Sequence, residues 1–492
     1  MITKEEKSGL DVAYIVSVDE LVPKDHILRK VQNSIDFSFI YDLVKGKYSE
    51  NKGRPSIDPV VLIKIPLLQA MFGIKSMRQT IKDIEVNLAY RWFLGLNFCD
   101  KVPHFSTFGK NYTRRFEGTD LFEQIFNHIL TLCCNYKLVN DDTIFIDATH
   151  IKACANRNKF NRKEVIKKQT KFYEESLRKE IAKDRKDHGK KELKDKGDNN
   201  DDFDGSCAQV QEMKDIKESK TDPESGWFHK GEHKEVFAYA TETACDRHGW
   251  ILGYTIHKGN EHDSTTFPSI YEKIKKFNPS VLVMDAGYKI PAIAKQTIDE
   301  GITPIFPYTR PKTKEGFFFK RAYKYDREKD CYICPFGEEL KYSTTTREGY
   351  KEYKSDKKIC ANCPHLKQCT ASKNTTKVVT RHVWEEYLEY CEEVRKMPAG
   401  EEIYKQRKET IERVFGTAKE HHGMRYTQQR GKSKMAMKVG LVYTAMNMKK
   451  LALLLHKDIH IIFSKIKNKL NYIKKQSKKL RNIPLPSFLS TV

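Results

Sequence analysis

Two short apolar runs, each leading into an aspartate, constrain the fold of this chain more than any other feature. Residues 143–146 (Thr-Ile-Phe-Ile) precede Asp147, and residues 281–284 (Val-Leu-Val-Met) precede Asp285. Short apolar runs of this kind predict strands that are buried on both faces. A carboxylate at the end of such a strand loses its hydration unless a cation or a hydrogen-bond donor meets it. We therefore expect both aspartates on neighbouring strands of one sheet; the alternative for each is an aspartate that caps a turn.

The segments around these strands predict a mixed α/β sheet. Residues 235–244 and 250–257 flank a glycine-containing turn, which predicts a β-hairpin. Helices are predicted over residues 264–277 and 291–300, and a last strand over residues 301–307. The resulting order β, ββ, α, β, α, β is the ribonuclease-H-like pattern, with an antiparallel hairpin and parallel crossovers.

The predicted fold class is multidomain α/β. We expect a helical N-terminal domain that binds DNA (1–140) and a first part of the core (141–309). This first part contains a charged insertion (157–226), whose first half could be a solvated helix. A cysteine-rich insertion (310–398), a second part of the core carrying Glu412 (399–456) and a basic tail (457–492) follow.

Glu412 supplies a third carboxylate, on a basic stretch with helical spacing. We predict helix from residue 400 to about residue 456. On a continuous helix, Tyr404, Lys408, Glu412 and Lys419 lie on one face, and Arg407 lies beside Tyr404 but is turned away from Glu412. The alternative is an amphipathic surface helix with ordinary Glu–Lys pairs.

Two strand carboxylates and one helix carboxylate are what a two-metal phosphoryl-transfer site requires, since the metal ions stand roughly 3.5–4 Å apart. The net charge of +23 favours nucleic acid as the phosphodiester. The competing explanation of the charge is a soluble protein that is merely rich in lysine.

The motifs resemble those of the DDE transposases of bacterial insertion sequences, which have a core like that of retroviral integrases. Residues 53–59 (Gly-Arg-Pro-Ser-Ile-Asp-Pro), 91–95 and 104–107 resemble the family's N-terminal helical domain. Residues 146–149 (Ile-Asp-Ala-Thr) and 284–288 (Met-Asp-Ala-Gly-Tyr) match its first two catalytic blocks, and residues 412–419 match the third.

This resemblance implies a function in cutting and joining DNA. Asp147 would bridge two Mg²⁺ (or Mn²⁺) ions, while Asp285 and Glu412 would each bind one. Tyr404 and Lys419 would contact phosphates. The family also has an arginine upstream of the glutamate, but here the spacing is one residue longer, which leaves Arg407 and Lys408 as alternatives.

The same resemblance implies the partners: the terminal inverted repeats of the element, target DNA, and a second copy of the chain in a dimer or larger synaptic assembly. Two alternatives remain open. One is a nuclease of the same fold that does not join strands, and the other is a catalytically inert, zinc-containing DNA-binding protein.

A cysteine group in the region 310–398 is a candidate for structural Zn²⁺. Two CxxC pairs and a further cysteine give five candidates for four tetrahedral positions. Either both pairs bind the ion, or the last four cysteines do; the alternative is reduced thiols without a metal. The five residues are Cys331, Cys334, Cys360, Cys363 and Cys369.

Membrane and secretion signals are not found in the sequence. No apolar run reaches the roughly 18–20 residues that span a bilayer, and residues 1–7 are polar. We expect a cytoplasmic, nucleoid-associated bacterial protein whose cysteines stay reduced.

Overall fold

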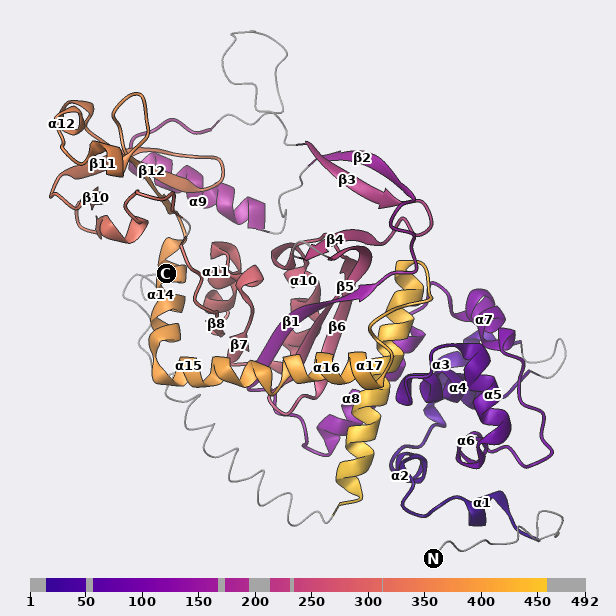
Figure 1. Cartoon of the computed structure of the whole chain (residues 1–492). Coiled ribbons are helices and arrows are strands. Elements are labelled where there is room, and N and C mark those ends of the chain that lie inside the picture. The colour runs from indigo at the N-terminus through magenta and orange to yellow at the C-terminus, as the bar shows by residue number, and fades with distance from the viewer. Residues whose placement is uncertain are drawn as a thin grey trace, which may run out of the picture.

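A helical N-terminal region and a mixed sheet lie on either side of one long C-terminal helix (Figure 1). This computed structural model describes residues 15–49, 56–166, 173–193, 213–230, 234–311 and 313–457. The predicted tail 457–492 therefore lies, apart from its first residue, outside the described residues. None of the helices in these ranges is long and apolar enough to cross a membrane.

The N-terminal region is helical, as predicted. In α4, Asp58 caps the first turn and the apolar side chains are buried on nearly every side of the helix. In α5, the side chain of Ser76 accepts the backbone N–H of Gln79. The elements are α1 (Val18–Leu21), α2 (Ile27–Ser34), α3 (Phe39–Val44), η1 (Lys45–Lys47), α4 (Pro59–Met71), α5 (Met77–Val86), α6 (Leu88–Leu94), α7 (Ser106–Asn111), η2 (Tyr112–Phe116) and α8 (Leu121–Asn135).

The central sheet is mixed and contains both predicted apolar runs. Its path is β4-β5-β1-β7-β8, and β6 also pairs with β5. β1 is antiparallel to β5 and parallel to β7, which is parallel to β8. The predicted hairpin is confirmed as β5 and β6. The strands are β1 (Thr143–Lys152), β4 (Gly226–Lys230), β5 (Lys234–Asp246), β6 (Ile251–Lys258), β7 (Val281–Val283) and β8 (Thr303–Ile305).

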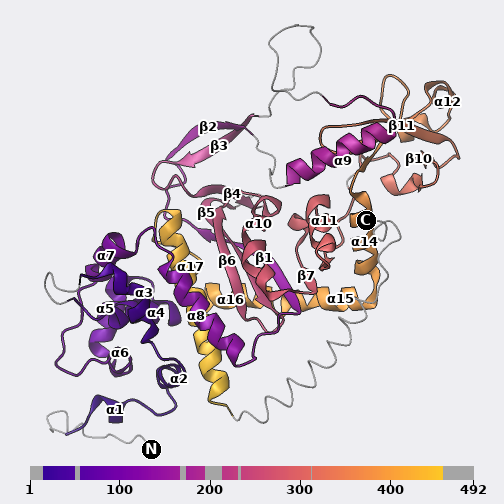
Figure 2. The same cartoon turned by 180° about the vertical axis from the view of Figure 1, so that it is seen from behind.

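Helices cover both faces of this sheet (Figures 1 and 2). Along β6, Tyr254 packs against Tyr443 of α17, whereas a Cβ at Gly253 would contact α10. Because neighbouring residues of a strand point to opposite faces, α10 and α17 lie on opposite sides. The elements are α10 (Asp263–Ile274), η4 (Lys275–Phe277), η5 (Ala286–Tyr288), α11 (Pro291–Asp299), α14 (Glu385–Lys396) and α17 (Lys432–Leu455).

The predicted continuous helix from residue 400 to residue 456 is wrong. The chain forms α15 (Pro398–Lys405), η7 (Gln406–Lys408), α16 (Ile411–His421) and then, after a ten-residue gap, α17. The first break falls at Thr410, whose ψ of −97° is not helical and whose hydroxyl donates to the carbonyl of Gln406 at 2.8 Å. Hydroxyls that bond to the backbone in this way compete with helical hydrogen bonding.

The cysteine-rich region forms a second sheet. Its order is β13-β12-β11-β10-β9, and its small core consists mainly of tyrosines. The elements are η6 (Lys320–Ala322), β9 (Lys324–Asp326), β10 (Cys331–Ile333), β11 (Glu339–Thr345), β12 (Tyr350–Ser355), α12 (Lys357–Ala361), α13 (Leu366–Cys369) and β13 (Val378–His382).

The charged insertion contains a helix, α9 (Glu174–Asp187), most of which is exposed, as expected; its two buried residues, Ile181 and Asp184, mark the face that packs against this second sheet (Figure 1). Asp184 is buried, with its carboxylate 2.5 Å from both Lys351 Nζ and the Thr345 hydroxyl. The charged sequence of α9 predicts contact with solvent, but the buried carboxylate of Asp184 is paired by residues of the second sheet instead of by water. We call α9 together with η6 to β13 the accessory unit. The same insertion also contains β2 (Phe160–Ile166) and β3 (Met213–Ser219), which form a separate antiparallel ribbon.

Candidate active site

Asp147 lies on β1, opposite Thr243 of β5, with a side chain that is 17% exposed. Its Oδ1 accepts the backbone N–H of Ala148 at 2.9 Å. Its Oδ2 accepts a hydrogen bond from Nη2 of Arg407 at 2.5 Å. Both oxygens of this carboxylate therefore have a donor, and one of the two donors is a cation.

Asp285 follows β7 by two residues and is brought next to Asp147 by the parallel pairing. Phe145 lies opposite Val283, so the same register continued by two residues sets Asp147 opposite Asp285. The Asp285 side chain is about half exposed, at 48%, and its Oδ1 lies 3.3 Å from Nη1 of Arg407. One guanidinium thus contacts both aspartates.

The turn after Asp285 packs tightly against the start of α10. A Cβ at Gly287 would lie 2.4 Å from Oδ2 of Asp263, a separation that real Cβ atoms do not tolerate. Glycine at this position therefore lets the turn approach α10 and fixes the direction in which Asp285 leaves the sheet.

Arg407 is the buried cation of this site. It lies in η7, is 5% exposed, and also donates to the hydroxyl of Tyr404 at 3.1 Å. The carboxylates of Asp147 and Asp285 raise the pKa of Arg407 against the effect of its burial. Sequence spacing left Arg407 and Lys408 as alternatives; the structure places Arg407 between the aspartates and leaves Lys408 exposed.

The positive charge of Arg407 only partly offsets the effect of burial on the pKa of Asp147. Burial raises the pKa of Asp147 to about 6; Arg407 lowers it and the charge of Asp285 raises it further. Two neighbouring carboxylates with oxygen atoms directed at one cationic group are a donor set that fits Mg²⁺ or Mn²⁺, which prefer oxygen ligands.

Glu412 lies in the first turn of α16, with an exposed side chain. The segment that carries it is tied to β1 at two points: Arg407 contacts Asp147, and Tyr426 forms a bridge with Lys152. The strand from Asp147 to Lys152 is about 17 Å long at ~3.3 Å per residue. The 11 residues of α16 span about the same length at ~1.5 Å each. Helix α16 packs against β1, and Glu412 follows Arg407 by five positions in the chain.

The other predicted phosphate contacts do not share one helical face, because the helix ends between them. Tyr404 is on α15, Lys408 on η7 and Lys419 on α16. Within the described ranges, no three or more His, Cys, Asp or Glu side chains are grouped so that they could hold one metal ion. The aspartates are brought together as a pair, and Glu412 lies outside that pair, exposed on α16.

Of the five cysteines, Cys334, Cys360 and Cys369 lie close together. Cys331 is buried in β10, where its charged neighbours include Glu339 and Asp326. Cys334 lies beyond the strand, and its Sγ accepts the backbone N–H groups of Phe336 and Glu338, each at 3.4 Å. Cys360 and Cys363 lie in and after α12, and Cys369 ends α13.

Three of these five thiols lie near the hydroxyl of Tyr323, which is 2.9 Å from Sγ of Cys369. Burial and then the thiols raise the pKa of Tyr323; the contributing residues are Cys369, Cys334 and Cys360. As noted above, the described side chains include no group arranged to hold a metal ion, so the structure gathers the thiols without forming a ligand set.

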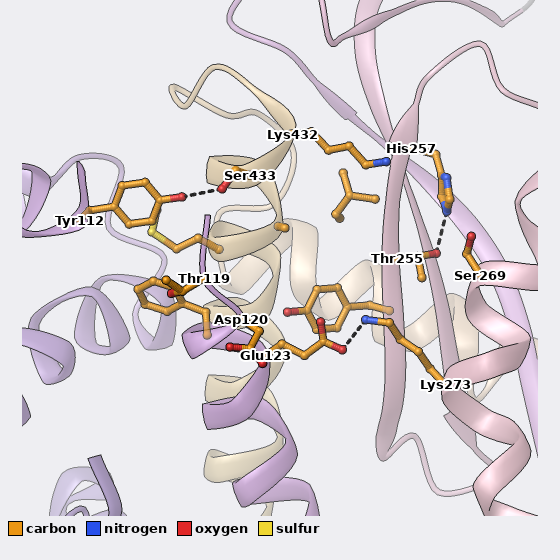
Figure 3. A pocket seen from close by; sticks show the side chains of 15 residues that line it. Tyr112, Thr119, Asp120, Glu123, Thr255, His257, Ser269, Lys273, Lys432 and Ser433 are labelled. Atoms are coloured by element: carbon orange, nitrogen blue, oxygen red, sulfur yellow. Dashed lines mark hydrogen bonds and ion pairs between the residues drawn. The ribbon is translucent and has the colours of Figure 1, made fainter. Parts of the chain in front are cut away.

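A cavity of about 310 Å³ lies away from the aspartates, at the edge strand β6 (Figure 3). Lys273 of α10 and Glu123 of α8 form an ion pair of 2.5 Å along its wall, and Tyr112 bonds to Ser433 at 2.9 Å. These contacts join α8 to α10 and η2 to α17. None of the predicted site residues lines this cavity, so it is not part of the candidate site.

Two transposase families match parts of the chain. The family described as a transposase domain (DUF772) matches residues 16–114, and the family described as a transposase DDE domain matches residues 333–452. The first match covers helices α1 to α7. The second contains most of the accessory sheet, Glu412 and most of α17, but begins after Asp147 and Asp285.

No curated protein matches the chain. Among solved structures, the Mos1 transposase paired-end complex with left transposon end is similar at 12% sequence identity and a TM-score of 0.15. The similarity covers 52% of this chain and 61% of that one. A TM-score this low carries no argument about the fold or the function.

The family matches follow one another in the order of an N-terminal transposase domain and a DDE domain, with the sheet of the aspartate pair between them. The chain is therefore similar to transposases in two separate regions, and the second of these is described as a transposase DDE domain.

Proposed function

We propose that the chain cleaves the ends of an insertion sequence and joins them to target DNA, with Asp147, Asp285 and Glu412 as its catalytic carboxylates. The single observation that supports this most is the meeting of Asp147 and Asp285 at one guanidinium. Two Mg²⁺ or Mn²⁺ ions, when bound, would activate the attacking hydroxyl and stabilise the leaving oxygen of the phosphodiester.

The chain's own residues would orient the metal ions and the DNA. Asp147 would contribute to both metal positions, and Asp285 and Glu412 to one each. Lys408 is exposed next to the buried Arg407, and we assign it, with Tyr404 and Lys419, to phosphates near the cleaved bond. Arg407 is buried against the carboxylates, so its contact with DNA requires it to leave them.

The strand order of the sheet supports a ribonuclease-H-like core, since β5 is antiparallel to both β1 and β6, whereas β6, β7 and β8 run parallel to β1. We keep the five domain limits given above as part of the proposal. The N-terminal domain would bind the terminal inverted repeats, and two or more copies would hold both ends, so the reaction would take place at the nucleoid.

The test uses DNA ends taken from inverted repeats that flank the coding region, a supercoiled target plasmid, and Mg²⁺. Asp147→Asn, Asp285→Asn and Glu412→Gln should each lose cleavage and joining by at least about a hundredfold, because metal ligands supply several kcal/mol to the transition state. Glu409→Gln, at an exposed neighbouring carboxylate, is the matched control and should stay active.

Three results would change the proposal. Full activity of the three variants would overturn the assigned site. Cleaved ends without joined products would identify a nuclease. Failure of the unmodified chain to cleave or to bind Mn²⁺ would leave an inert DNA-binding protein.

We further propose structural Zn²⁺ on Cys334, Cys360, Cys363 and Cys369, without Cys331. Supporting this, the Cys334 sulfur accepts two backbone N–H groups, which stabilise a thiolate, and thiolates are the ligands of structural zinc. Elemental analysis of the purified chain should find one zinc per chain. Cys369→Ser should lose it and Cys331→Ser should keep it; absence of zinc from the unmodified chain would refute the assignment.

A further inference from the structure

The position of Arg407 bears on how the metal ions enter the site. Its two terminal nitrogens contact different aspartates, Asp147 Oδ2 at 2.5 Å and Asp285 Oδ1 at 3.3 Å. A divalent cation bound between the two aspartates would need these same carboxylates as ligands. The guanidinium therefore occupies the space between the carboxylates.

A second cation cannot share these oxygens at the same positions. Mg²⁺ binds oxygen at about 2.0–2.1 Å, closer than a guanidinium nitrogen does. The remaining oxygen of Asp147 already accepts the N–H of Ala148. Since each oxygen of Asp147 already has a donor, a metal ion placed between the two carboxylates competes with the Arg407 side chain for the same oxygens.

We propose that Arg407 is the resting counterion of the metal-free site and that a divalent cation must displace its guanidinium in order to bind. The inference rests on the proposed function, since it takes Asp147 and Asp285 as metal ligands. Arg407 thereby lowers the affinity for free metal ions, and its release gives the site a mobile cation next to the DNA phosphates.

Partners on the arginine itself agree with this role. The hydroxyl of Tyr404 accepts from Nη1 at 3.1 Å, the same nitrogen that contacts Asp285. Nε is buried and has no hydrogen-bond partner among the described residues. An arginine built only as a permanent structural link would be expected to use that donor as well.

The test measures Mn²⁺ affinity of the full chain without DNA, by titration with electron paramagnetic resonance of the free ion. Displacement predicts that Arg407→Gln binds Mn²⁺ more tightly than the unmodified chain, by about tenfold, since a competing cation has been removed. Arg407→Lys keeps the charge, but a single ammonium group cannot contact both carboxylates as a guanidinium does. Its Mn²⁺ affinity should therefore lie between those of the unmodified chain and Arg407→Gln.

Thermal unfolding supplies a second readout. Without metal, Arg407→Gln should melt at a lower temperature than the unmodified chain, because two neighbouring carboxylates lose their counterion, and Mn²⁺ should restore most of the loss. Arg425→Gln is the matched control: its side chain is 66% exposed and pairs with Glu420 instead of the aspartates, so neither readout should change.

The outcomes separate the inference from the proposed function. Unchanged or weaker Mn²⁺ binding by both Arg407 variants, together with loss of binding in Asp147→Asn, would overturn displacement while keeping the metal site. Unchanged Mn²⁺ binding in Asp147→Asn and Asp285→Asn would overturn the metal site itself, and the inference with it.

Discussion

A buried glutamate next to the active strand should make the stability of this protein depend on pH. Glu242 lies on β5, opposite Ala148 of β1, and is 1% exposed. Its Oε2 accepts from the Thr255 hydroxyl at 3.2 Å and lies 3.7 Å from Nε2 of His257. Burial is the main cause that raises the pKa of Glu242, from 4.5 to about 8.

The direction of the effect follows from proton binding. Between about pH 4.5 and pH 8 the folded chain holds a proton on Glu242 that the unfolded chain has released. The free energy of unfolding therefore falls as pH rises through this window, by up to roughly 1.4 kcal/mol per pH unit. Over the whole window the loss approaches about 5 kcal/mol as an upper limit.

Glu242→Gln removes this dependence, because an amide has the size of the protonated acid and still accepts from Thr255. Between about pH 5.5 and about pH 7.5, the variant should gain roughly 3 kcal/mol of stability relative to the unmodified chain. Urea unfolding with EDTA present measures this gap, followed by tryptophan fluorescence at each pH. The comparison requires that the unfolding free energy of both proteins fall with the same slope as the urea concentration rises.

Glu272→Gln is the control, since the side chain of Glu272 is 58% exposed and pairs only with a neighbouring lysine on the surface. Its unfolding free energy should follow that of the unmodified chain at every pH. A constant gap between Glu242→Gln and the unmodified chain across the window would refute the reasoning, as would a variant that is less stable near pH 8.

Two further predictions concern close packing. Gly287→Ala places a Cβ 2.4 Å from Oδ2 of Asp263 and should cost roughly 1–3 kcal/mol of stability and weaken Mn²⁺ binding by displacing the turn after β7. Gly416→Ala, which has open space at its Cβ inside α16, should leave Mn²⁺ binding unchanged and raise stability by about 0.5–1 kcal/mol in the same titration and unfolding assays. Asp184→Ala should free α9 from the accessory sheet, at a cost of roughly 2–4 kcal/mol for a broken buried pair. Hydrogen exchange over α9 should accelerate, whereas the exposed Asp187→Ala should leave it unchanged.

The sheet could be predicted from the sequence because its signals are local. Runs such as 143–146 and 281–284 are apolar throughout, and interior strands of a parallel pair are buried on both faces. The breaks in the expected helix from residue 400 to residue 456 could not be predicted from helical spacing. The first lies at Thr410, whose hydroxyl donates to the carbonyl of Gln406, and Arg407 just before it contacts Asp147, which lies 260 positions earlier in the chain.

Within the site, the sequence predicts which residue types take part but not how their side chains are arranged. Spacing alone could not decide between Arg407 and Lys408, because the choice depends on which side chain the fold buries. The cysteines show the same limit: Cys331 is buried in the hairpin of β10 and β11, and CxxC spacing alone does not indicate which cysteine a strand buries.

The contact between α9 and the accessory sheet has a consequence for synthesis. Asp184 meets Thr345, which follows it by 161 positions, so the helix leaves the ribosome long before its partner strands exist. Until β11 and β12 have been made, the carboxylate of Asp184 and the apolar side chain of Ile181 remain in water. The accessory unit therefore completes its folding late, and a chain shortened at either insertion would leave the other half with an unpaired surface.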